Sequence, residues 1–159
     1  MRKIIILLLY IVFFWGVIPF ILLGSSVYLD SLLAFEPYRL TAIGILVLII
    51  AVPMLVLSIV QYVRQSGELP VSAYPPQAIF SRGIYNYLRH PIYLFYILVF
   101  IGIAMIRGSL SMLLIVMPVF IALNRVYVYV EEKQLIKRFG DAYRFYLSLI
   151  HISEPTRPY

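Results

Sequence analysis

Two polar, aromatic-rich segments hold the residues whose types and spacing could do chemistry. The first is Ser81–Tyr93, SRGIYNYLRHPIY, and the second is Glu131–Tyr146, EEKQLIKRFGDAYRFY. Between them run two apolar stretches joined by the turn Arg107-Gly108-Ser109. A helical hairpin of this length returns its two ends to the same membrane surface. We therefore expect the two segments to meet there and to form any reaction centre.

His90-Pro91 predicts the start of a helix that could bind an anion. Proline disfavours helical backbone in the residue before it and suits the first helical position, so His90 is the expected N-cap. The free N–H groups and positive dipole at that end favour a carboxylate or a phosphate, and Arg89 adds a fixed cation. In the alternative interpretation, Arg89 and His90 only anchor the helix end among lipid headgroups.

Glu131 and Glu132 follow directly after an apolar stretch. Neighbouring helical residues point about 100° apart, so one carboxylate can face inward while the other faces water. Arg125, Tyr129 and Glu132 share one helix face, which indicates Glu132 as the inward carboxylate. A carboxylate held near lipid suits a cationic group such as an ammonium. Alternatively, both glutamates are solvated beside Lys133.

Tyrosines gather around both segments. Most fit an interfacial aromatic belt, whereas a few could enclose a sulfonium, because cations are attracted to ring faces. They are Tyr85, Tyr87, Tyr93, Tyr96, Tyr127, Tyr129, Tyr143 and Tyr146. The sequence has no P-loop, dinucleotide-binding, HExxH or GxSxG motif. It has no cysteine and only two histidines, so we predict no metal site.

The composition is typical of a membrane protein, because the 159 residues are 63% hydrophobic and only 13% charged. The predicted fold is all-α, a single domain with four transmembrane helices over about 4–23, 40–63, 91–106 and 109–130. The third span would reach only about 24 Å, so we expect Arg107 to extend towards the interface. Residues 24–38 are expected to form a loop, and Pro53 and Pro118 to kink their helices.

The basic residues predict the orientation of the chain in the membrane. The net charge is +6, but the cations lie at the ends of apolar stretches rather than in a patch, which argues against nucleic-acid binding. With four spans, one side holds ten Lys and Arg residues and the other holds two, Arg39 and Arg107. Both termini, the loop 64–90 and the helical extension 131–146 are therefore expected in the cytoplasm, in what we expect to be a prokaryotic inner membrane.

The C-terminal part divides into a helical extension and a tail. The fourth helix should continue to about Phe139, with Gly140 ending it and Asp141 capping a short helix over 142–146. The string LSLIHISEPTR, from Leu147 to Arg157, resembles the translation of a sequencing-library adapter. We therefore treat 147–159 as a non-native tail, expect the natural sequence to differ beyond Tyr146, and assign no role to the tail.

Taken together, the polar segments resemble the isoprenylcysteine carboxyl methyltransferase and phospholipid methyltransferase superfamily. The similarity extends from Pro75-Pro76 to Tyr146, and the order of its motifs makes it specific. The motifs are Gly83-Ile84-Tyr85, Arg89-His90-Pro91-Ile92-Tyr93, Glu131-Glu132 with Leu135, and Phe139-Gly140 with Tyr143 and Tyr146.

This resemblance implies an integral-membrane enzyme that uses S-adenosylmethionine at the cytoplasmic end of the hairpin. The residues that it implies around the cofactor are Tyr85, Arg89, His90, Pro91, Tyr93, Glu131 and Glu132. Beyond positioning it implies no catalytic residue, with Arg89 and Glu132 as candidates. The family continues with a segment containing Arg and Pro that helps to cover the cofactor; here the adapter-like string replaces it, which puts the activity of the chain as written in doubt.

We expect His90 and the helix end to hold the methionine carboxylate of the cofactor, and a glutamate to bind its ammonium. The expected acceptor is an isoprenylcysteine-type carboxylate that enters from the bilayer. Two alternatives stay open: methylation of a lipid amine, and a small membrane scaffold without enzymatic activity. A transporter is disfavoured because the predicted span interiors carry no ionisable groups.

Overall fold

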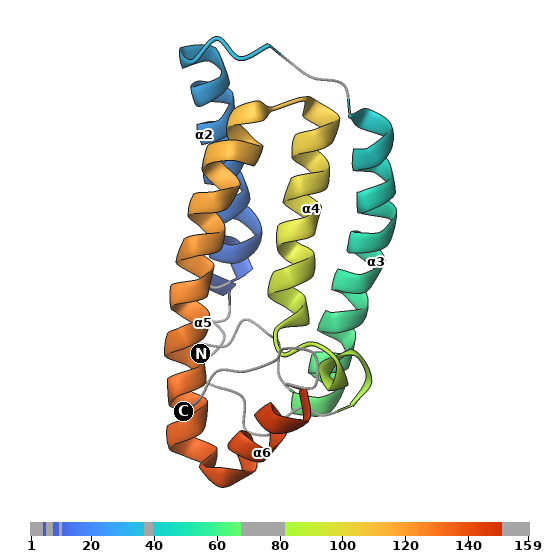
Figure 1. The fold of residues 1–159 in the computed structure, drawn as a ribbon, viewed down its shortest axis with the longest axis vertical. Coiled ribbons are helices and arrows are strands. Elements are labelled where there is room, and N and C mark those ends of the chain that lie inside the picture. The colour runs from blue at the N-terminus through green and yellow to red at the C-terminus, as the bar shows by residue number, and fades with distance from the viewer. Residues whose placement is uncertain (1–4, 6–7, 10, 37–39, 68–81, 151–159) are drawn as a thin grey trace.

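A computed structural model describes residues 5, 8–9, 11–36, 40–67 and 82–150, and all regular elements in these ranges are helical. The predicted all-α class is therefore confirmed. The long helices stand side by side, with the α4–α5 turn at the upper end and α6 at the lower end (Figure 1). The elements are η1 (Phe13–Val17), α2 (Ile18–Leu32), α3 (Thr41–Ser66), η2 (Gly83–Asn86), α4 (Pro91–Arg107), η3 (Met112–Val116), α5 (Met117–Phe139) and α6 (Asp141–Ile150).

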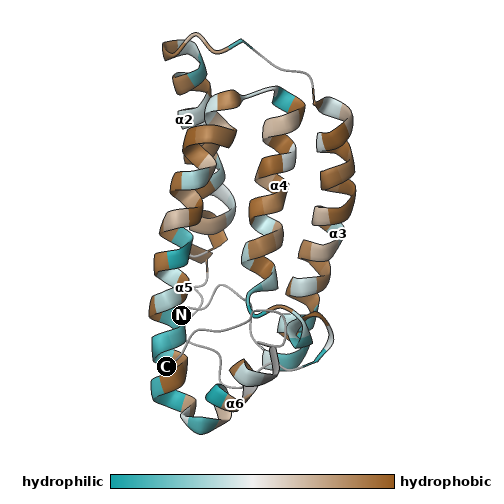
Figure 2. Ribbon diagram, viewed as in Figure 1, coloured by the Kyte–Doolittle hydropathy of each residue, from teal (hydrophilic) through white to brown (hydrophobic). Residues whose placement is uncertain are grey.

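Among the described residues, three helical stretches are long and apolar enough to cross a membrane: Phe13–Leu32, Thr41–Ser66 and Met112–Phe139. The fourth, α4, has 17 residues and is shorter, as expected for the third span. Large apolar side chains point outward along the bundle; Phe20, for example, is 79% exposed. Hydrophobic residues cover most of the helix lengths, and hydrophilic residues gather at the lower end (Figure 2). Such an outer surface fits lipid, while the count of four spans stays a prediction.

The first helix is longer than predicted. The expected loop over 24–38 was wrong at its start, because α2 continues to Leu32. The hydroxyls of Ser26 and Ser31 donate to the carbonyls three residues earlier, so these polar side chains are satisfied within the helix. The extension also places Asp30 in a helix that could span the membrane, so the predicted absence of ionisable groups from the spans was wrong.

Asp30 joins the end of α2 to the α4–α5 turn. Its carboxylate accepts hydrogen bonds from the Ser109 hydroxyl and, at 3.0 Å, from the Ser111 N–H. The Ser111 hydroxyl donates to the Ser26 carbonyl at 2.8 Å. Gly108, with a φ of 69°, makes the left-handed turn that brings these residues into place. This polar network holds the closed end of the hairpin, opposite the end where the polar segments meet.

The helices α3 and α4 approach each other closely because each has a glycine at the contact. A Cβ atom on Gly44 would lie 2.7 Å from the carbonyl oxygen of Gly102, and one on Gly102 would lie 2.8 Å from Leu48 Cδ2. Small residues allow such close backbone packing between membrane helices. The contact fixes α4 against α3. The main core cluster consists of Leu22, Leu55, Tyr96, Phe100, Ala104, Met112, Val116 and Met117.

The π-helical segment η1 is joined to α4 by a hydrogen bond. Within η1 the N–H of Ile18 donates to the carbonyl of Phe13, five residues earlier. The next donor in this pattern would be Pro19, which has no N–H. The hydroxyl of Tyr96 donates to the Phe14 carbonyl at 2.6 Å and thereby ties the first helix to α4.

We predict that Tyr96→Phe destabilises the fold by about 1 kcal/mol, because it removes a hydrogen bond to a partly buried carbonyl. Pro19→Ala restores a backbone N–H, so Tyr96→Phe should cost less in that background. Unfolding of the four variants in detergent, compared as a double-mutant cycle, measures the difference. If Tyr96→Phe cost the same stability in both backgrounds, Pro19 would not influence the contribution of the Tyr96 hydrogen bond.

The predicted helix ends beside the two polar segments are confirmed. His90 is the N-cap of α4 and Pro91 is its first residue. At the other segment α5 ends at Phe139, followed by Gly140 with a φ of 53°, a conformation that favours glycine.

The last helix, α6, begins at Asp141, one residue before the predicted start at 142, and runs to Ile150, beyond the predicted end at residue 146. The extra turn includes Leu147, which is buried with Tyr143 against Leu135 of α5. Because that apolar contact requires helical backbone at both positions, it accounts for the longer helix. The tail from 151 onwards, and Pro75-Pro76, lie outside the described residues, and the adapter-like origin of the tail stays a prediction.

Candidate functional site

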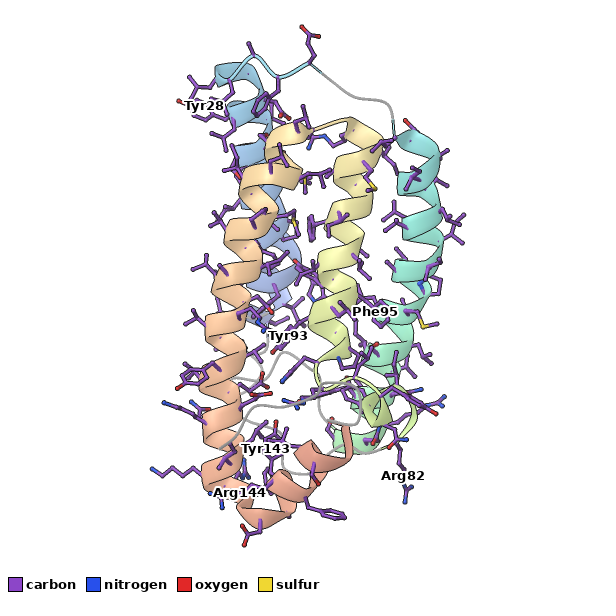
Figure 3. All side chains as sticks on the ribbon, viewed as in Figure 1. Tyr28, Arg82, Tyr93, Phe95, Tyr143 and Arg144 are labelled. Carbon is purple, nitrogen blue, oxygen red and sulfur yellow. The ribbon has the colours of Figure 1, made fainter. Side chains whose placement is uncertain are left out.

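The two polar segments meet at the lower end of the bundle, as expected from the hairpin. Tyr93 on α4 lies between α4 and α5, with Tyr143 and Arg144 of α6 below it (Figure 3). The hydrogen bonds across this junction join residues 38 and 43 positions apart in the sequence. The hairpin therefore builds one site from both segments.

Glu132 on α5 contacts both basic residues that precede α4. Its Oε1 accepts a hydrogen bond from Arg89 Nη1 at 3.4 Å and lies 3.5 Å from His90 Nε2. These three side chains are only 19–24% exposed, so solvent screens their charges less than those of a surface pair. His90 Nε2 itself is buried and makes no hydrogen bond within the described part of the chain.

Glu131 contacts the other side of the same imidazole. Its Oε2 accepts a hydrogen bond from the Tyr93 hydroxyl at 3.3 Å and lies 3.8 Å from His90 Nδ1. The His90 ring stacks on the Tyr93 ring, with centroids 5.6 Å apart and planes 22° apart. The imidazole therefore sits between two carboxylates, and Tyr93 fixes its orientation.

The structure corrects the prediction that one glutamate faces inward while the other faces water. Both carboxylates reach the start of α4, because their long side chains extend to either side of the His90 ring. The face used for the prediction was also wrong: Arg125 is exposed, and Tyr129 is 58% exposed with Lys133 Nζ 4.5 Å from its ring centroid.

Tyr127 is the tyrosine on α5 that meets the site. Its ring packs edge-on against Tyr93, with centroids 5.9 Å apart. Tyr127 is nevertheless 47% exposed, so it lies at the rim of the site rather than inside it.

Tyr85 and Pro91 were also expected at the site, and the structure gives them anchoring contacts. Tyr85 is buried, and its hydroxyl donates to the Ser58 carbonyl of α3 at 3.1 Å. Pro91 is fully buried at the start of α4. The contacts described for these two residues position the segment around Arg89 and His90, and a direct role towards a ligand stays a prediction.

The charges of the cluster favour a cationic ligand group. Two carboxylates, Glu131 and Glu132, face one permanent cation, Arg89, and an imidazole. With a neutral His90 the four groups carry one net negative charge. The free N–H groups at the start of α4 and Arg89 can in turn hold an anionic group. The site therefore suits a ligand with charges of both signs. Among the described residues no His, Cys, Asp and Glu grouping fits a metal ion.

Reasoning from the sequence missed Gln61 and Gln65 at the end of α3. Gln61 Oε1 accepts a hydrogen bond from the Ile84 N–H at 2.8 Å, and Gln65 Nε2 donates to the Arg82 carbonyl at 3.3 Å. A signal was present, because Gln61 interrupts the apolar pattern near the end of the second span and Gln65 follows it one helical turn later.

These features define a helical membrane protein with a charged site at one end of its bundle. The chain belongs to the phospholipid methyltransferase family, whose model matches residues 40–142. The match begins one residue before α3 and ends in α6, so it includes the first polar segment, the hairpin and residues 131–142 of the second polar segment. The resemblance inferred from the motifs is thereby confirmed. No curated protein and no solved structure matches the chain. The family and the three apolar helices together indicate an integral membrane protein.

Proposed function

We propose that the chain is an S-adenosylmethionine-dependent methyltransferase whose cofactor is held by Arg89, His90, Glu131 and Glu132. The observation that carries the proposal is the convergence of both glutamates on the start of α4, inside the region matched by the family. The hairpin brings these distant residues together, and their contacts are polar in a chain that is mostly apolar.

The residues fit the charged groups of this cofactor. Its amino-acid part has an ammonium and a carboxylate, and its sulfur is a cationic sulfonium. A glutamate can accept from the ammonium, while Arg89 and the N–H groups of α4 can bind the carboxylate. The Tyr93 ring offers its face to a cation. His90 Nε2, which is buried and makes no hydrogen bond with the residues that the structure describes, is a further polar group that a ligand could pair with.

The chemistry demands positioning rather than a set of reactive side chains. When bound, S-adenosylmethionine supplies a methyl group that the acceptor displaces in line from sulfur. The protein residues would orient both reactants and exclude water. Arg89 and Glu132 are partly buried and contact each other, so they are well placed to hold a fixed geometry.

For the acceptor we propose an isoprenylcysteine-type carboxylate, with a phospholipid amine as the alternative that the family description favours. A carboxylate can attack without losing a proton, whereas a protonated amine must first lose one. The acceptor would enter from the bilayer between the helices. We further propose four spans, with the site and both termini in the cytoplasm, and residues 1–146 as the functional unit.

The test uses the full chain in lipid nanodiscs. S-adenosylmethionine at 100 times its dissociation constant should stabilise the protein by about 2.7 kcal/mol. His90→Ala should weaken binding about tenfold through loss of a partly buried polar group. Arg144→Ala serves as a control, because Arg144 is 68% exposed and pairs only with Asp141 among the ion pairs described.

The acceptor is decided by transfer of a labelled methyl group. Prenylated cysteine and phosphatidylethanolamine are offered in parallel, and the labelled product identifies the class. A scaffold protein would show neither stabilisation nor transfer, and that result would refute the proposed function.

A further inference from the structure

The end of α3 anchors the segment that leads to the site. Ser58, Gln61 and Gln65 lie at i, i+3 and i+7, on one face of α3. The Ser58 carbonyl accepts from the Tyr85 hydroxyl, and both glutamines hydrogen-bond to backbone groups of residues 82–84. Three successive positions of one helix face therefore contact η2 and the residue before it.

The central contact of this anchor joins Gln61 to Gly83 and Ile84. Gln61 Oε1 accepts from the Ile84 N–H at 2.8 Å. A Cβ atom on Gly83 would collide with the Gln61 side-chain amide, and Gly83 has a φ of 64°, which disfavours other residues. The glycine therefore permits both the turn and the close approach of the glutamine.

Ile84 links Gln61 to the site through backbone hydrogen bonds. Its carbonyl accepts from the N–H groups of Tyr87 at 3.1 Å and Leu88 at 3.0 Å. Leu88 directly precedes Arg89, the partner of Glu132. A continuous series of hydrogen bonds thus runs from the Gln61 side chain through η2 to the residue before the basic pair.

We infer that Gln61 is a positioning residue for the cofactor site, setting where Arg89 and His90 stand relative to the two glutamates. The inference rests on the proposed function for its ligand and on the described contacts for its geometry. Gln61 lies on α3 and has no described contact with the charged cluster, so its effect passes through Ile84 and η2.

Two substitutions separate the hydrogen bond from the bulk of the side chain. Gln61→Met keeps an unbranched side chain but removes the acceptor for the Ile84 N–H. Gln61→Glu is the conservative variant, because its carboxylate can still accept that hydrogen bond. Gly83→Ala is a second disruptive variant, which displaces Gln61 by steric conflict.

The experiment measures S-adenosylmethionine binding, steady-state kinetics and amide hydrogen exchange in nanodiscs. Gln61→Met should weaken cofactor affinity and raise the KM for the cofactor by about tenfold, the size expected from one lost, partly buried hydrogen bond. kcat should change less, because at a saturating cofactor concentration the bound cofactor restores the geometry of the site. Exchange should quicken over residues 84–90. Gln61→Glu should stay within about twofold of the parent chain, the sign that the acceptor is retained, and Gly83→Ala should follow Gln61→Met.

Unchanged exchange over 84–90 in Gln61→Met would overturn the inference, whether or not the cofactor binds. Unchanged affinity, in a parent chain that does bind, would also overturn it. If the parent chain binds no cofactor while exchange still quickens, the anchor stands but the proposed function and the positioning role both fall. If Gln61→Glu lowered cofactor affinity as much as Gln61→Met, the effect would come from the identity of the side chain rather than from the acceptor for the Ile84 N–H. That result would overturn the inference as well.

Discussion

Glu132→Gln is expected to lower the affinity for S-adenosylmethionine by roughly 10- to 100-fold, since a hydrogen bond to a charged group contributes about 1.5–3 kcal/mol. Glu132 contacts Arg89 and His90 at 3.4 Å and 3.5 Å, so its charge orders both basic residues. Glutamine preserves the shape of the side chain but not the charge. The cofactor ammonium would lose its acceptor, and Arg89 would be held less firmly. Equilibrium binding in nanodiscs measures the effect.

Asp141→Asn is the matched control for this prediction. Asp141 also pairs with an arginine at 3.4 Å, but its side chain is 97% exposed. An exposed ion pair contributes little, so cofactor affinity should stay the same. Equal losses from Glu132→Gln and Asp141→Asn would contradict the assignment of the cluster, because they would show a general effect of charge.

Gly44→Val is expected to destabilise the fold by about 1–3 kcal/mol or more, as overpacked sites do. A Cβ atom at this position meets the Gly102 carbonyl oxygen and the Ile106 backbone nitrogen, at 2.7 Å and 2.9 Å. Backbone atoms cannot move aside as a flexible side chain can, so α3 and α4 must separate. Because α4 positions His90, cofactor affinity should fall together with stability. Unfolding in detergent measures the first effect, and cofactor binding measures the second.

Gly24→Ala provides the control for Gly44→Val. A Cβ atom on Gly24 meets nothing within 4 Å, and the residue lies inside α2. Alanine is the better helix former there, so stability should stay the same or rise by about 0.5–1 kcal/mol. If Gly44→Val unfolded no more readily than this control, close packing of α3 and α4 would not be what sets the position of α4.

The sequence predicted best those features that depend on neighbouring residues. His90-Pro91 specified the start of α4, and Gly140 specified the end of α5, because proline and glycine restrict or permit backbone angles locally. The hairpin followed from the length of its two apolar stretches. Together these predicted which end of the bundle holds the site.

The features that the sequence did not predict depend on partners far away in the chain. Gly24–Leu32 looked like a loop because it is polar. The Asp30 carboxylate, however, accepts hydrogen bonds from Ser109 and Ser111, about 80 residues later. Helix geometry indicated Glu132 as the inward carboxylate, although the resemblance placed both glutamates at the cofactor; the direction of Glu131 is decided by Tyr93 and His90 at the start of another helix.

The Gln61 contact with Ile84 joins residues 23 positions apart, so no local pattern could specify it. A polar residue at the end of an apolar span is equally expected from solvation at the interface. The sequence therefore indicated a polar residue at this position, whereas only the fold identified its hydrogen-bond partner, the Ile84 N–H.

The most direct test of the central claim is photocrosslinking of labelled S-adenosylmethionine to the full chain in nanodiscs, followed by tryptic mapping. Cleavage after Arg89, Arg107, Arg125 and Lys133 gives the peptides 90–107 and 126–133, which contain His90 with Tyr93 and Glu131 with Glu132. We predict that the label is found in these two peptides and is displaced by excess unlabelled cofactor. Displaceable label found only outside these two peptides and the peptide 83–89, which contains Arg89, or no displaceable label at all, would contradict the assignment of the site.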